Sequence, residues 1–127
     1  MSVALNTAAS ALVLFAHGSH DPQWAEPFRT LQRRLAQKRP ELAVELAFLE
    51  LMQPSLPDAL ERLAETHARI TIAPLFMGKG AHVRRDLVQL IDGIRKRHPE
   101  AQIDVLTAVG EAEPVLEAIS AWLSDQV

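Results

Sequence analysis

The chain has 127 residues, of which 48% are hydrophobic and 23% charged, and its net charge is −3. These values predict one globular domain, residues 1–127, with a hydrophobic core of its own. They exclude a protein that binds nucleic acid through a strongly basic surface. The sequence has no cysteine, which excludes disulfides, thiolate metal ligands and a cysteine nucleophile.

The apolar segments are too short for a membrane protein. The longest near the start runs from Ala8 to Ala16, well below the roughly 20 residues of a membrane-spanning helix. The segment from Met1 to Asn6 has no basic region and no convincing cleavage site, so we expect no signal peptide. We therefore expect a cytoplasmic protein with no membrane partner.

Short apolar runs alternate along the chain with segments of helical periodicity. The runs are continuous enough for strands buried on both faces, and the helical segments repeat apolar residues at helical spacings. The expected strands are Ala11 to Ala16, Val44 to Leu49, Ile70 to Phe76 and Ile103 to Leu106. The expected helices run from Trp24 to about Lys38, from about Ser55 through Leu63, from about Ala81 to Arg97 and from Glu113 to Leu123.

Four strand–helix repeats predict a parallel sheet with right-handed crossovers and helices on both faces. We expect a three-layer α/β fold of flavodoxin-like plan, with four parallel strands in the order 2-1-3-4. In that order the first and third strands are neighbours at the topological switch point. Open α/β sheets bind their ligands there, beyond the carboxyl ends of the strands.

Two histidines follow those two strands. His17 stands between Ala16 and Gly18, and His82 follows Gly80 at the start of the third expected helix. Both imidazoles are therefore expected at one edge of the sheet, in a site that binds a metal or transfers protons. The positive end of the helix dipole disfavours imidazolium at His82. The alternatives are a hydrogen-bonded turn histidine at His17 and a phosphate-binding loop before His82, although that loop lacks the P-loop spacing.

Glu50 ends the second expected strand, beside the first. Its carboxylate is expected at the same edge of the sheet as the two histidines. Two imidazoles and a carboxylate suit a divalent transition metal held with open positions. We therefore predict a metal site of His17, Glu50 and His82. The alternative for Glu50 alone is a solvated loop residue.

Positive charge is expected near the same edge from Lys79, Arg84 and Arg85. Ser19 and Asp21 are expected to cap the first helix, and the free amides at that helix start and near His82 can bind ligand carboxylates. We expect Ser19, Lys79, Arg84 and Arg85 to contact an anionic substrate. The alternative is that the basic residues form only a solvated surface.

The assembled motifs resemble the CbiX/SirB-type sirohydrochlorin chelatases in their short, single-domain form. The resemblance covers most of the chain, from about Leu12 to Leu123. Four elements carry it in the expected order: Ala16 to Pro22; Ala47 to Glu50 with Pro54 to Leu56; Pro74 to Phe76 with Gly80 to Asp86; and Val109 to Glu111.

The resemblance implies a lyase that inserts a divalent metal into sirohydrochlorin, a tetrapyrrole with many carboxylates, without ATP. It implies that His17 and His82 are the active-site histidines and that Glu50 belongs to the metal site. It also implies a homodimer and no cofactor beyond the metal substrate. The donor set tolerates Co²⁺, Fe²⁺ and Ni²⁺ alike, and the product would enter cobalamin or sirohaem synthesis.

Two other functions remain open from the residues. A non-catalytic module that stores or delivers a metal or a tetrapyrrole would bind its ligand stoichiometrically, without turnover. A flavodoxin-like regulatory domain with incidental histidines would keep its interactions when both histidines are replaced. An assay of metal-dependent turnover separates these functions from a chelatase.

Overall fold

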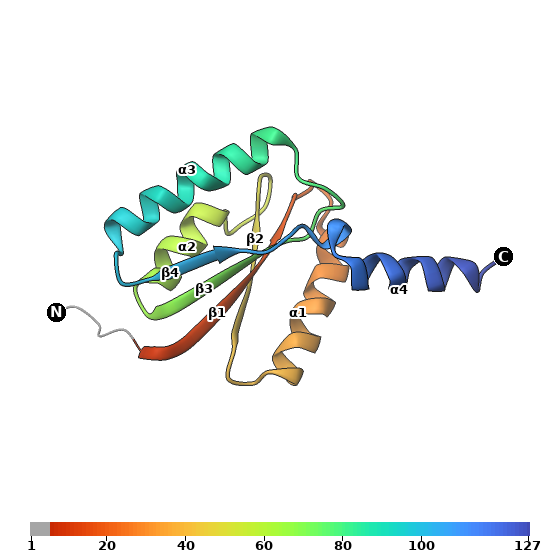
Figure 1. Ribbon diagram of the computed structural model, residues 1–127, viewed down its shortest axis with the longest axis horizontal. Coiled ribbons are helices and arrows are strands. Elements are labelled where there is room, and N and C mark those ends of the chain that lie inside the picture. Colours follow the sequence, from red (N-terminus) through yellow and green to blue (C-terminus); the bar gives the residue numbers. More distant parts are fainter. Residues whose placement is uncertain (1–5) are drawn as a thin grey trace.

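The computed structural model describes residues 6–127, and the segment 1–5, where we expect no signal peptide, lies outside them. The chain forms a parallel four-stranded sheet in the order β2-β1-β3-β4 (Figure 1), which confirms the predicted topology. The strands are β1 Asn6–Ala16, β2 Ala43–Phe48, β3 His67–Pro74 and β4 Gln102–Val105. The α-helices are α1 Glu26–Lys38, α2 Leu56–Ala64, α3 Ala81–Arg97 and α4 Glu113–Ser124. Two short 3-10 helices, η1 Pro22–Ala25 and η2 Val109–Glu111, precede α1 and α4.

The helix boundaries follow local hydrogen bonding. Ser55 caps α2, because its hydroxyl oxygen accepts a hydrogen bond from the amide of Asp58 at 3.3 Å. The first α-helix begins at Glu26, two residues later than the predicted start at Trp24. Pro27 has no N–H to donate to the carbonyl four residues earlier, so the segment before it forms the 3-10 turn η1.

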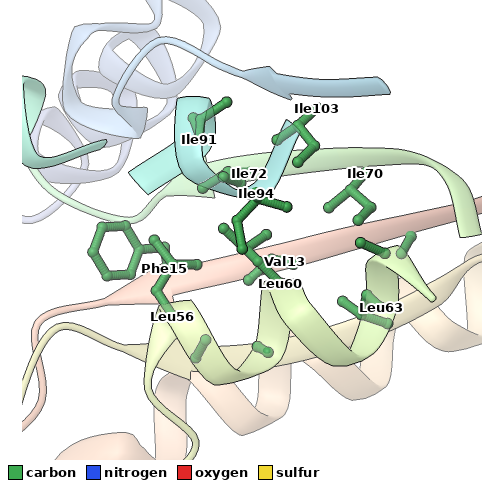
Figure 2. Packing of buried hydrophobic residues seen from close by; sticks show 14 of the residues in the cluster. Val13, Phe15, Leu56, Leu60, Leu63, Ile70, Ile72, Ile91, Ile94 and Ile103 are labelled. Atoms are coloured by element: carbon green, nitrogen blue, oxygen red, sulfur yellow. The ribbon is translucent and has the colours of Figure 1, made fainter. Parts of the chain in front are cut away.

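Each face of the sheet carries its own hydrophobic cluster. The larger cluster lies between the sheet and helices α2 and α3, where Phe15, Leu60 and Ile72 are at most 2% exposed (Figure 2). The smaller cluster lies on the α1 side, where Leu14 and Phe48 are buried. This confirms the prediction of helices on both faces, and α4 extends past the end of the sheet instead of lying on it (Figure 1).

Within residues 6–127, every helix is too short or too polar to cross a membrane.

An ion-paired cluster joins the ends of α2 and α3. The Glu61 carboxylate pairs with Nε2 of His98 at 2.8 Å and with the guanidinium of Arg97. These partners hold the pKa of Glu61 below its usual value of 4.5, the hydrogen bond from His98 contributing most and that from Arg97 next. Because the native state favours the carboxylate, this contribution to stability is present above the pKa of the unfolded chain. It is lost as the pH falls through the lowered pKa of the folded protein.

We expect Glu61→Gln to destabilise the protein at pH 7 by about 0.5–1 kcal/mol, because the side chain is 37% exposed and water screens the pair. The difference from wild type should shrink as the pH falls below 4.5. Urea unfolding at several pH values measures it. Glu100→Gln is the control, since Glu100 is exposed and has no ion pair within the described residues. A Glu61→Gln effect that stays constant with pH would contradict the ion-pair explanation.

Candidate functional site: the carboxyl edge of the sheet

Backbone hydrogen bonds continue past the ends of β1, β2 and β3 and tie their following loops together. The amide of Leu49 donates to the carbonyl of Ala16 at 2.9 Å, and the amide of Glu50 donates to that of His17 at 3.1 Å. On the other side of β1, the amide of Leu75 donates to the carbonyl of Phe15 at 2.8 Å. The loops that carry the predicted site residues therefore start from one edge of the sheet, as the strand order predicts.

His17 and Glu50 form a pair at this edge. Nε2 of His17 lies 3.2 Å from Oε1 of Glu50, within hydrogen-bonding distance. The two side chains are 57% and 54% exposed, so both are open to solvent and to a ligand. A carboxylate hydrogen-bonded to one ring nitrogen fixes the orientation of the imidazole, and it leaves the other ring nitrogen free for a proton or a metal.

Gly18 is what allows these two loops to come so close. Its φ is +102°, a backbone conformation that side chains disfavour. A Cβ at this position would lie 1.8 Å from the carbonyl oxygen of Glu50, far inside van der Waals contact. Only glycine fits at position 18. This position directly follows His17 and lies against the backbone of Glu50.

Phe76, which lies in the loop after β3, packs against the ring of His17. The two rings meet edge to face, with centroids 6.2 Å apart and an interplanar angle of 75°. Phe76 also meets the buried Phe15 at 5.3 Å in a similar geometry. The ring of Phe76 therefore contacts both Phe15 in the core and the exposed imidazole of His17. Phe76 was predicted only as the last residue of a strand, whereas β3 ends at Pro74. An aromatic residue just before a histidine-bearing loop was the available signal for its place beside the site.

Hydrogen bonds join the loop before His82 to η2. The amide of Gly110 donates to the carbonyl of Phe76 at 2.9 Å, and a Cβ on Gly110 would lie 2.1 Å from Cα of Met77. The Glu111 carboxylate accepts a hydrogen bond from the amide of Lys79 at 3.4 Å. The start of α3 is therefore held in place by the segment that follows β4.

His82 lies in the first turn of α3 and is exposed, as predicted. The structure brings His17 and Glu50 together, but within residues 6–127 no three histidine, aspartate or glutamate side chains form a group that could hold a metal ion. His82 is therefore not part of a preassembled three-ligand cluster with the other two residues. His82 lies at this edge because α3 follows β3, and β3 pairs with β1.

The residues predicted to contact the substrate differ in whether their side chains already form hydrogen bonds within the protein. The Ser19 hydroxyl accepts a hydrogen bond from the amide of Asp21 at 3.1 Å, so it stabilises the turn before η1. The Arg84 guanidinium donates to the carbonyl of Lys79 through Nε at 3.3 Å and Nη2 at 3.0 Å. Arg85 is exposed on the first turns of α3. Their contacts with a substrate stay predictions.

An apolar cavity of about 200 Å³ opens at the same end of the larger cluster, between the N-terminal ends of α2 and α3. Asp86 is its only acidic lining residue, and Phe15 connects it to the ring of Phe76. The lining residues are Phe15, Phe48, Leu49, Leu56, Pro57, Val83, Asp86, Leu87 and Leu90. An apolar surface therefore lies close to the polar pair.

The fold and this edge define an open parallel α/β protein with an exposed histidine–carboxylate pair at the carboxyl end of its sheet. The chain belongs to the CbiX family, whose family model matches residues 11–126. It is 33% identical over 89 residues to the sirohydrochlorin cobaltochelatase of Methanocaldococcus jannaschii, a match that covers 69% of this chain and 62% of that protein. It is 31% identical over 115 residues to the sirohydrochlorin cobaltochelatase of Saccharolobus islandicus, covering 85% of this chain and 88% of that protein.

A solved structure shows the same fold. The crystal structure of a CbiX protein from Marinobacter aquaeolei superposes with a TM-score of 0.75 at 27% identity, over 92% of this chain and 93% of that chain. The chain spans less than two thirds of the Methanocaldococcus jannaschii protein, at 62% of its length.

Replacing Gly18 tests whether the close approach of the two loops holds the site together. We expect Gly18→Ala to destabilise the protein by about 1–3 kcal/mol or more, because the new Cβ collides with the Glu50 carbonyl and the positive φ is strained. Thermal and urea unfolding measure this loss. Gly80→Ala is the matched control, since its Cβ would meet nothing within 4 Å. Equal stability of the two variants would show that the loops can separate without cost.

Proposed function

We propose that this protein inserts a divalent metal, Co²⁺ or Fe²⁺, into sirohydrochlorin. The observation that carries the proposal is the exposed His17–Glu50 pair at the ligand-binding edge of a CbiX-family fold. The names of the relatives from Methanocaldococcus and Saccharolobus support the same reaction. Nickel is a third metal that this kind of donor set accepts.

Metal insertion into a tetrapyrrole removes two pyrrole protons and moves a partly dehydrated metal from the protein to the ring. A neutral His17 imidazole can accept a proton or hold the incoming metal, and Glu50 beside it offsets positive charge in either case. A pair of donors leaves most coordination positions open, unlike the closed four-ligand sites that retain zinc. Such a site can release its metal to the four ring nitrogens.

His82 supplies the second imidazole in this proposal. It approaches from the loop after β3, while His17 approaches from the loop after β1. Two bases on neighbouring loops suit a reaction that removes two protons.

The substrate's carboxylates require positive partners at the edge. The helix α3 begins at Ala81, and its N-cap residue Gly80 makes no side-chain cap, so the first amides of α3 are available to an anion. Lys79 and Arg85 add positive charge beside them, Arg84 braces the loop, and Ser19 holds the turn after His17. The apolar cavity next to Leu49 offers a surface for the uncharged part of a macrocycle.

The proposal includes no nucleotide or redox cofactor, because proton loss and metal transfer need neither. It also includes a homodimer, since one small domain encloses only part of a large macrocycle at an edge where both site residues are more than half exposed. The proposal also includes a cytoplasmic location, where proteins seldom contain disulfides, and this chain has no cysteine to form one.

The test mixes purified protein with sirohydrochlorin and each metal and follows the absorbance change against a no-protein control. We expect His17→Ala and His82→Ala each to lower the catalysed rate by about 10²-fold or more, since each removes a base or ligand. Glu50→Gln should also slow the reaction, because it keeps the shape and removes the charge. His67→Ala is the control, since His67 begins β3 at the opposite edge of the sheet.

Three outcomes decide between the functions. Many product molecules per protein support a chelatase. Stoichiometric ligand binding without turnover would instead indicate a storage or delivery protein. Equal rates with and without the protein, together with ligand binding that survives replacement of both histidines, would leave only a regulatory domain.

A further inference from the structure

Leu51, the residue after Glu50, has a backbone conformation that leucine rarely adopts. Its φ is +67°, and among residues 6–127 it is the only residue other than glycine with a positive φ. In this region the Cβ of a side chain crowds the following carbonyl oxygen, which glycine avoids and asparagine tolerates. Strained residues of this kind persist where the surrounding structure holds them, and they gather at functional sites.

A tight turn explains the φ of Leu51 but not the choice of leucine. The amide of Met52 donates to the carbonyl of Glu50 at 2.8 Å, which closes a three-residue turn with Leu51 at its centre. The same carbonyl lies against Gly18, and the amide of Glu50 donates to the carbonyl of His17 at 3.1 Å. The turn therefore belongs to the backbone arrangement that keeps Glu50 beside His17. Glycine or asparagine at position 51 would make this turn with less strain.

Packing within the domain does not explain the leucine either. Leu51 is 53% exposed, and neither hydrophobic cluster within residues 6–127 includes it. Leu49, on the other side of Glu50 in the chain, is 38% exposed and lines the apolar cavity. Glu50 is therefore flanked in the chain by two leucines that are open to solvent. Apolar side chains around a few polar groups are typical of sites that bind small molecules.

A third exposed apolar side chain lies on the loop after β3. Met77 is 65% exposed, and the close approach of Gly110 fixes its backbone. Because β1 lies between β2 and β3, the loop that carries His17 starts between the loops that carry Leu51 and Met77. Exposed apolar residues therefore stand on the loops at both sides of His17.

The chemistry of metal insertion identifies the ligand for these residues. The four nitrogens of a tetrapyrrole lie in the plane of the ring, so a metal reaches them from one face. That face must lie over His17 and Glu50 when the pair delivers the metal, and residues next to the pair then contact it. The face of the ring is apolar, whereas its carboxylates are at the rim. An exposed leucine beside Glu50 is complementary to the face and not to the rim.

We propose that Leu51 binds the face of the tetrapyrrole ring beside Glu50, and that the strained turn is retained because it presents a leucine to this ligand. The inference rests on the proposed metal insertion and adds a residue that determines affinity for the substrate. Leu51 contacts the ring and not the metal, so it stabilises the bound ring equally before and during metal transfer. Its loss therefore weakens binding without slowing the transfer itself.

The first experiment measures the strain in the absence of any ligand. Leu51→Asn keeps a side chain of similar size, accepts the positive φ and removes the apolar contact. We expect it to raise the melting temperature by about 2–5 °C, because relief of backbone strain outweighs the loss of a half-exposed apolar side chain. Val88→Asn is the matched control, since Val88 is 60% exposed within the helix α3 and its replacement relieves no strain. A lower melting temperature for Leu51→Asn would show that the leucine stabilises the fold, and it would overturn the proposal.

The second experiment measures the binding of sirohydrochlorin without metal, through the fluorescence of the ring. We expect Leu51→Asn to raise the Kd by about tenfold, whereas Leu51→Met, which stays apolar, should remain within about threefold of wild type. Val88→Asn should bind as wild type does. With metal present, Leu51→Asn should raise KM by about the same factor and leave kcat at saturating substrate nearly unchanged.

The outcomes separate this inference from the proposed function. A Leu51→Asn variant that is more stable and binds the ring as tightly as wild type would overturn the inference. A change of its mass in gel filtration would overturn it too, because Leu51 would then be a contact between two chains. If His17→Ala abolishes turnover while Leu51→Asn keeps the wild-type Kd and KM, the proposed function stands and this inference alone fails. If wild type neither binds sirohydrochlorin nor inserts metal, the proposed function fails, and this inference fails with it.

Discussion

β1 pairs in parallel with β2 on one side and with β3 on the other, and the functional edge depends on this arrangement. The register sets Ala16 opposite Phe48 and Phe15 opposite Pro74, so the three strands end at nearly the same level. Parallel strands present their carboxyl ends on one side of a sheet, where the following loops must meet. Residues separated by more than thirty positions in the chain thereby become neighbours at hydrogen-bonding distance, as His17 and Glu50 are.

The edge combines rigid backbone with accessible side chains. Gly18 and Gly110 permit backbone contacts that any larger residue would block, and these contacts fix the loops. The imidazole and the carboxylate that the loops carry remain more than half exposed. This division suits the proposed transfer of a metal, because fixed loops limit the cost of binding while a small number of ligands limits its strength.

The helices cover the sheet unevenly. On one face α1 contacts β1 and β2, and α4 leaves the sheet after η2 (Figure 1). The same anchored turn holds the loop before His82 through Phe76 and Lys79. The direction in which α4 leaves and the position of the loop before His82 are therefore set by one short element, η2.

Much of this protein can be predicted from its sequence because the determining signals are local. Apolar runs and helical spacings gave the strands and helices, and α3 begins and ends at the predicted residues Ala81 and Arg97. The start of α1 was missed by two residues, because the missing N–H of Pro27 outweighs the apolar periodicity that includes Trp24. The strand order 2-1-3-4, chosen for a flavodoxin-like plan because the sequence pattern alone leaves it open, was confirmed.

The sequence by itself determined which residue types reach the carboxyl edge: an imidazole after β1, a carboxylate after β2, and a second imidazole after β3. Only the tertiary structure decided that His17 and Glu50 pair directly, that His82 stays outside a three-residue cluster, and that Phe76 supports the first imidazole. It also decided that α4 leaves its own sheet uncovered. The physical reason is range: periodicity and caps act over a few residues, whereas these contacts depend on loop paths and backbone approach between segments far apart in the chain.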